Sequence, residues 1–99
     1  MPNTLLQIEY TNTFCVEASF GVDLDDGRNR LHIISFAPNV DIDQLMAAAS
    51  ENFAAAGDPP FPADAASQIK AFAAPYRTQA IIDSYIQKQQ EIAISMVRA

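Results

Sequence analysis

Residues 14–24 carry the feature that most constrains the fold of this chain, because apolar side chains alternate with polar or small ones through the whole stretch. The even positions are all apolar: Phe14, Val16, Ala18, Phe20, Val22 and Leu24. A period of two is the spacing of a β-strand with one buried face. The pattern therefore predicts a strand whose even side chains lie in the core and whose odd side chains form a second face, here called the odd face.

A turn follows this strand. Asp26 and Gly27 are residue types that tolerate positive φ in a two-residue hairpin turn. We therefore expect residues 30–36 to return as an antiparallel partner strand. With Asp26 and Gly27 as the loop, Phe20 faces Ile33 and both side chains are buried.

The same register sorts the other side chains of residues 30–36. It sets Asp23 opposite Arg30, a favourable cross-strand ion pair. It places His32, Ile34 and Phe36 on the odd face, where the two apolar side chains would form an exposed spot. Either the last helix covers this spot or another chain does.

The remaining segments predict one further strand and then helices. Residues 4–10 alternate and would pair with the central strand through a loop at 11–13, setting Leu6 opposite Ala18. Asp41 and Gln44 form a plausible capping box for a helix over 41–56, closed by Gly57. Prolines make residues 58–62 a linker. Two more helices are expected over 64–73 and 75–97, the last starting at Pro75.

This order predicts a single α+β domain over residues 1–99, with a three-stranded antiparallel meander at about 4–36 followed by three helices packed on one sheet face. The last helix would bury a stripe at helical spacing. Its members are Ile81, Ile82, Tyr85, Ile86, Gln89, Ile92, Ala93 and Met96.

The charge of the chain is acidic and uneven. The net charge is −6, and residues 1–50 hold seven carboxylates against two arginines, a balance of −5. Binding to nucleic acid depends on clustered Lys and Arg, so direct nucleic-acid binding is not expected and a basic partner is favoured. One cysteine permits no internal disulfide, and the sequence shows neither a signal peptide nor an apolar run of about 20 residues. We expect a cytoplasmic protein without membrane contact.

No motif ties residues to a reaction. The three glycines are far apart, which argues against a phosphate-binding loop, and one cysteine with one histidine cannot hold structural zinc. Cys15 and His32 share the odd face, but the register separates them by about 20 Å, too far for a nucleophile and its base. The sequence therefore predicts no catalytic, cofactor or metal residue, and we do not expect an enzyme.

Asp23, Asp25 and Asp26 concentrate acid at the hairpin tip. Calcium loops have similar carboxylate density, but this stretch lacks their ligand spacing. A solvated turn and a docking patch for basic residues are the other two interpretations. His32 is either an ordinary surface histidine, or a pH-sensitive contact or general base.

The leading hypothesis is a small non-catalytic protein-interaction module: an adaptor, assembly factor or inhibitor of a larger machine, one form of which is a nucleic-acid-binding machine. Its predicted partner-binding residues are Glu17, Asp23, Asp25, Asp26, His32, Ile34 and Phe36. One alternative is a ligand-binding domain or enzyme with a pocket between sheet and helices, lined by Tyr10, Glu17, His32 or Tyr85. The other is a homo-oligomeric structural subunit that associates through Ile34, Phe36 or Ile94.

Overall fold

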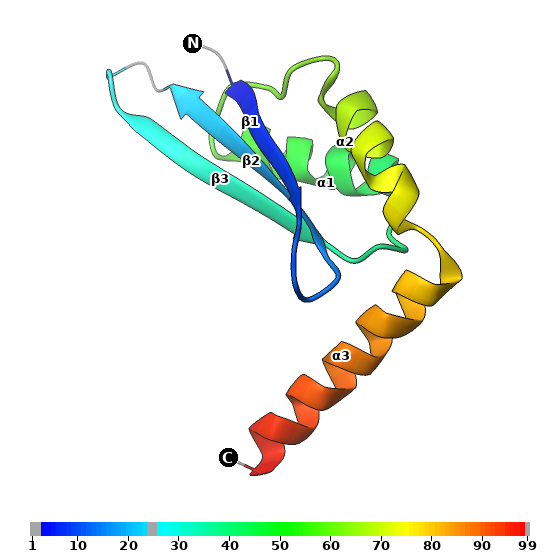
Figure 1. Ribbon diagram of the computed structural model, residues 1–99. Coiled ribbons are helices and arrows are strands. Elements are labelled where there is room, and N and C mark those ends of the chain that lie inside the picture. Colours follow the sequence, from blue (N-terminus) through cyan, green and yellow to red (C-terminus); the bar gives the residue numbers. More distant parts are fainter. Residues whose placement is uncertain (1–2, 24–25, 99) are drawn as a thin grey trace.

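The computed structural model describes residues 3–23 and 26–98, apart from the side chain of Arg98, and has three strands followed by helices (Figure 1). The strands are β1 (Asn3–Tyr10), β2 (Val16–Asp23) and β3 (Asn29–Phe36), and they form one antiparallel sheet in the order β1-β2-β3. The helices are α1 (Ile42–Ala55), α2 (Ala65–Ala73), the short 3₁₀ helix η1 (Ala74–Tyr76) and α3 (Gln79–Arg98). The predicted α+β order of a meander followed by three α-helices is confirmed.

The core lies between the sheet and the first two α-helices, which cover one face of the sheet, here called the inner face (Figure 1). The even side chains of β2 point into this core and have no exposed surface, as their alternation predicts. Three of them pack with side chains from β3, α1 and α2, and the whole cluster is Val16, Ala18, Phe20, Phe36, Ile42, Met46, Ala65, Ile69 and Ala73. The opposite face is here called the outer face.

The predicted register between β2 and β3 is wrong by one residue. Phe20 faces His32, not Ile33, and Phe36 faces Val16. The predicted two-residue turn requires Asp23 to face Arg30, but Asp23 faces Asn29. Asp25, which flanks the predicted turn, lies outside the described residues. A shift of one residue moves every side chain of β3 to the other face of the sheet.

Two pairs of side chains in β3 therefore lie on the opposite faces of the sheet from those predicted. Ile34 and Phe36 pack in the core, and Phe36 is only 6% exposed. Leu31 and Ile33, predicted to be buried, stand on the outer face instead. Ile34 and Phe36 therefore do not form the exposed spot that was expected on the odd face of the sheet.

The pairing of β1 with β2 also differs from the prediction. Ile8, not Leu6, faces Ala18, and the register shifts between Leu5 and Gln7. This irregularity turns Leu6 to the outer face. The connection is longer than the predicted three residues, because the backbone N–H of Thr11 donates to the carbonyl of Cys15 at 2.8 Å and Phe14 takes a positive φ of 64° within it.

Helix α1 begins and ends where its capping residues predict. The Asp41 carboxylate accepts a hydrogen bond from the backbone N–H of Gln44 at 3.1 Å. Gly57 follows the helix with φ +79°, and its N–H donates to the carbonyl of Ala54 at 3.0 Å. The linker after it lies against the core, where the ring of Phe61 is 4.7 Å from that of Phe20 between centroids.

Helix α3 departs most from expectation. Pro75 lies in η1, and α3 begins at Gln79, after Thr78, whose hydroxyl accepts from the N–H of Ile81 at 3.3 Å. The helix does not pack on the sheet but projects away from it (Figure 1). Every described side chain from Gln89 onward is exposed. The inner face is already covered by α1 and α2, so the predicted stripe of α3 is not buried by its own chain.

Candidate interaction surface

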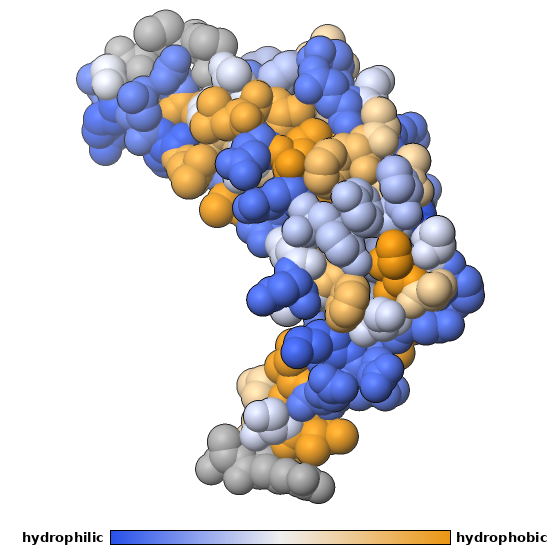
Figure 2. All heavy atoms as spheres, in the orientation of Figure 1, coloured by the Kyte–Doolittle hydropathy of each residue, from blue (hydrophilic) through white to orange (hydrophobic). Residues whose placement is uncertain are grey.

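The outer face of the sheet exposes three large aliphatic side chains. Leu6, Leu31 and Ile33 are 59%, 63% and 54% exposed. Figure 2 shows hydrophobic residues gathered over the sheet, on the side away from α1 and α2. Aliphatic side chains gathered on one open face are typical of an interaction site.

Small residues of β2 lie between Leu6 on one side and Leu31 and Ile33 on the other. Gly21 pairs with Leu31 across β2 and β3, and Ser19 pairs with Ile33. On the other side of β2, the side chain of Leu6 lies against Gly21, because a Cβ atom at Gly21 would come within 3.1 Å of its Cδ1 atom. The outer face is therefore a shallow apolar strip along β2, with aliphatic side chains on both sides.

Carboxylates lie at both ends of this strip. Glu9 of β1 is directly opposite Glu17 of β2, and Asp23 lies at the far end opposite Asn29. Like charges that face each other across two strands destabilise a sheet. Among the described residues of this face there is no Lys or Arg. The Glu9 carboxylate accepts a hydrogen bond from the Nε2 atom of Gln7 at 3.3 Å, and a cation placed between Glu9 and Glu17 would pair with both carboxylates.

The acid of the hairpin tip is partly neutralised within the loop. The carboxylate of Asp26 accepts from the Nε of Arg28 at 2.6 Å and from its backbone N–H at 3.1 Å. The expected pair of Asp23 with Arg30 is absent, since Asp23 faces Asn29. Asp25 lies outside the described residues. Glu17 and Asp23 are the predicted partner-binding residues that the structure places on the outer face.

A second polar cluster lies on the inner side of β3. The guanidinium of Arg30 donates to the Asp58 carboxylate, whose side chain is only 4% exposed. The Nε2 atom of His32 is 3.8 Å from the other carboxylate oxygen of Asp58. The ring of His32 lies against Phe53, with centroids 4.5 Å apart. Through Asp58, these contacts hold the linker after α1 against β3.

This cluster corrects the predicted place of His32 and contains a residue that the sequence analysis missed. His32 is not beside Asp23 on an open surface but half-buried against Phe53. The sequence pattern places Asp58 only in a linker. A signal was present, because Arg30 and His32 are two apart in a strand and so share a face, and an Arg side chain at the edge of a core needs an acceptor.

The structure brings no nucleophile and base together at Cys15 and His32. His32 pairs with Phe20, five residues along the chain from Cys15, which corresponds to about 16 Å. The N–H of Cys15 instead donates to the hydroxyl of Thr11 at 3.3 Å in the connection.

The four side chains expected to line a pocket do not converge. Glu17 points to the outer face and His32 to the inner face. Tyr10 stacks on Tyr76 with centroids 4.1 Å apart, where its partial burial, followed by the charges of Tyr76 and Cys15, raises its pKa. Tyr85 is on α3. A hollow of about 440 Å³ lies elsewhere and is lined by Asn39, Asp41, Ile42, Lys70, Ala74 and Arg77.

Within residues 3–23 and 26–98, no three His, Cys, Asp or Glu side chains are grouped so that they could hold a metal ion. None of the helices in those ranges combines the length and apolarity needed to cross a membrane. Comparison of the chain with protein-family models, with curated proteins and with solved structures finds no match.

Proposed function

We propose that this protein is a non-catalytic interaction module that binds a partner protein on the outer face of its sheet. One observation carries the proposal: Leu6, Leu31 and Ile33 are more than half exposed on a face that no helix covers. An adaptor, an assembly factor or an inhibitor of a larger machine would use such a face. The function is thus association and not chemistry.

The charges of the outer face favour a partner with basic and apolar side chains. A Lys or Arg placed between Glu9 and Glu17 would neutralise two carboxylates that face each other across β1 and β2. Its aliphatic stem would extend toward Ile33, since long basic side chains cover apolar surface while their charged group remains solvated. Covering the exposed parts of the three aliphatic side chains contributes roughly 3 kcal/mol. That magnitude, together with the ion pairs, suits a transient complex.

A differential capture experiment tests this proposal. The chain is immobilised, and proteins retained from a lysate are quantified for the parent chain, for Ile33→Asp and for the double variant Glu9→Gln with Glu17→Gln. Ile94→Asp is the matched control, because Ile94 is also an exposed isoleucine, at 53%, but lies on α3. We expect one set of basic proteins to be lost with the first two variants and kept with the control. Equal capture by all four chains would refute the proposed surface.

A protein with a nucleic-acid-binding groove is one form of the proposed partner, in which carboxylates of this chain take the place of phosphates. This form needs the acid of the hairpin tip. Substitution of Asp23, Asp25 and Asp26 by Asn should then abolish the interaction, and DNA should compete for the same partner. Binding that survives the three substitutions would exclude this form while leaving the apolar strip as the main contact.

A further inference from the structure

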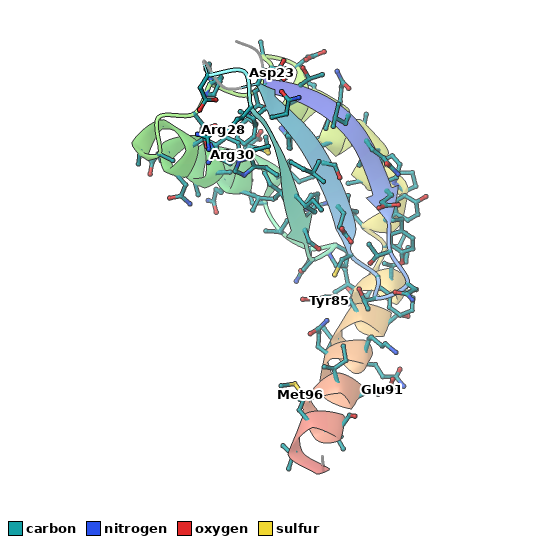
Figure 3. All side chains as sticks on the ribbon, turned by 90° about the vertical axis from the view of Figure 1, so that its left-hand side faces the viewer. Asp23, Arg28, Arg30, Tyr85, Glu91 and Met96 are labelled. Carbon is teal, nitrogen blue, oxygen red and sulfur yellow. The ribbon has the colours of Figure 1, made fainter. Side chains whose placement is uncertain are left out.

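Helix α3 carries an apolar stripe that the chain leaves open. Its members, here called the α3 stripe, recur at intervals of three and four residues and so lie on one side of the helix. They are Ile82, Tyr85, Ile86, Gln89, Ile92, Ala93 and Met96. Figure 3 shows Tyr85 and Met96 pointing to the same side of α3 and Glu91 pointing to the other.

The side of α3 opposite the stripe is the one nearest the body of the protein, and Ile82 and Tyr85, at the start of the stripe, are half-buried. The connection between β1 and β2 borders a hollow beside the helix. This hollow is lined by Asn12, Phe14, Ser84, Gln87, Lys88 and Glu91, of which the four helical residues are outside the stripe. The stripe therefore faces away from the body of the protein, and Ile86, Ile92 and Met96 are 46%, 36% and 73% exposed.

The stripe is symmetric about Gln89. Ile86 and Ile92 are three residues before and after it, Tyr85 and Ala93 are four before and after, and Ile82 and Met96 are seven before and after. Such a set meets itself when two copies run in opposite directions. The largest side chain, Tyr85, then lies against the smallest, Ala93.

We propose that α3 forms an antiparallel two-helix dimer with a second copy of this chain. Gln89 lies at the two-fold axis, where its amide pairs with Gln89 of the second copy, since an amide both donates and accepts. Ile86 packs on Ile92 of the second copy, and Tyr85 fills the space over its Ala93. A contact of this kind is isologous and closes at two copies.

The charge distribution permits a second copy on α3 and favours one direction of the pair. Asp83 and Glu91 balance Lys88 and Arg98 in residues 79–98, so α3 is neutral and residues 1–78 carry the whole net charge of −6. A parallel pair would set two acidic bodies side by side. An antiparallel pair separates them by about the length of a 20-residue helix, roughly 30 Å, which exceeds the screening length of about 8–10 Å.

Sedimentation equilibrium tests the proposal. The contact of two single helices falls at or below the lower end of about 1,200–2,000 Å² typical of stable complexes, so we expect a dissociation constant in the micromolar range. The mass should rise from the chain mass of 10.8 kDa toward twice that value as the concentration increases. A single-chain mass at all concentrations up to about 1 mM, well above such a dissociation constant, would overturn the proposal.

Two matched variants show whether the stripe carries the contact. Ile92→Asp buries an unpaired carboxylate in each copy and should weaken the dimer by at least about 100-fold. Ile94→Asp changes the same residue type two positions away, off the stripe, and should leave the dimer within about twofold of the parent chain. Both side chains are exposed in the single chain, at 36% and 53%, so the two variants should fold alike. Equal weakening by both would overturn the assignment.

Disulfide crosslinking decides the direction of the helices. In a Cys15→Ser background, Gln89→Cys should crosslink under oxidation, because the antiparallel pair brings the two copies of position 89 together. Ile82→Cys should not, because position 82 faces position 96 of the second copy and its own counterpart is about 21 Å away along the axis, beyond the reach of a disulfide. Efficient crosslinking at position 82 would refute the antiparallel arrangement.

Discussion

Removal of the Asp58 side chain should destabilise the fold although the residue lies outside any helix or strand. Asp58→Ala takes away the acceptor of the Arg30 guanidinium and the nearest anion to His32. The side chain of Asp58 is 4% exposed, so the carboxylate partner of this ion pair is shielded from water. The backbone N–H of Asp58 still donates to the carbonyl of Phe53 at 2.9 Å, and the end of α1 is therefore kept.

The expected loss follows from the burial of the two partners. Breaking a fully buried ion pair costs about 3–5 kcal/mol because a charge is left unpaired. Here the side chain of Arg30 is 44% exposed, so water can hydrate its guanidinium when the carboxylate is lost. We therefore expect a loss of about 2 kcal/mol in the free energy of unfolding, which for a domain of this size lowers the melting temperature by roughly 8–16 °C.

Urea unfolding at neutral pH measures this loss, with Asp43→Ala as the control. Asp43 pairs with Lys70 at 2.6 Å, but the two side chains are 66% and 49% exposed, and such surface pairs contribute less than about 1 kcal/mol. The two variants remove the same side chain and differ in burial. If Asp58→Ala cost no more than Asp43→Ala, the assignment of Asp58 as the residue that fastens the linker to β3 would be wrong.

Three other expectations can be checked by the same unfolding experiments. Gly57→Ala should lower the free energy of unfolding by about 1 kcal/mol, since Gly57 has a φ of +79° and no neighbour that a methyl group would touch. Phe20→Ala should cost about 3–5 kcal/mol because Phe20 is fully buried, whereas Ile33→Ala, on the outer face, should change stability by less than about 0.5 kcal/mol. The folded state raises the pKa of Tyr10, so it holds the phenol proton more tightly than the unfolded chain does. The contribution of this protonated phenol to the free energy of unfolding is present below about pH 10 and is lost as pH rises through the folded pKa. Unfolding between about pH 9 and 11 should therefore show a smaller loss of stability in Tyr10→Phe than in the parent chain.

The sequence was sufficient wherever one short segment determined the answer. The even positions of β2 could be assigned to the core because the odd positions offered nothing apolar of comparable size. The start of α1 could be placed because Asp41 and Gln44 act within one turn. In these cases the contacts that determine the structure are between residues close in sequence, so a local pattern predicts them.

The register of β3 could not be decided in this way. Both of its faces are apolar, since Leu31 and Ile33 alternate with Ile34 and Phe36, and either pair could fill a core. The observed register buries the second pair and turns His32 toward the inner side, where Asp58 supplies the anion. Asp58 lies 26 residues after His32 in the chain. No pattern within the hairpin itself therefore indicates that this anion is present.

The error in the register also moved the candidate site. Glu17 and Asp23 keep their predicted place on the open face, but the apolar part of that face is Leu6, Leu31 and Ile33. The amphipathic pattern of α3 likewise showed that one side of the helix is apolar. It could not show that α3 projects away from the sheet, because periodicity contains no information about what covers an apolar stripe.

The most direct test of the account is an NMR titration of the isotope-labelled chain with a short synthetic peptide that alternates lysine and leucine. A peptide of the same length that alternates glutamate and leucine is the control. We expect the lysine peptide alone to shift the amide signals of Glu9, Glu17, Leu31 and Ile33, with an affinity that falls as salt is added and falls again in the Glu9→Gln, Glu17→Gln variant. Shifts confined to other surfaces, or equal effects of the two peptides, would contradict the claim that the outer face is a docking surface for a basic partner.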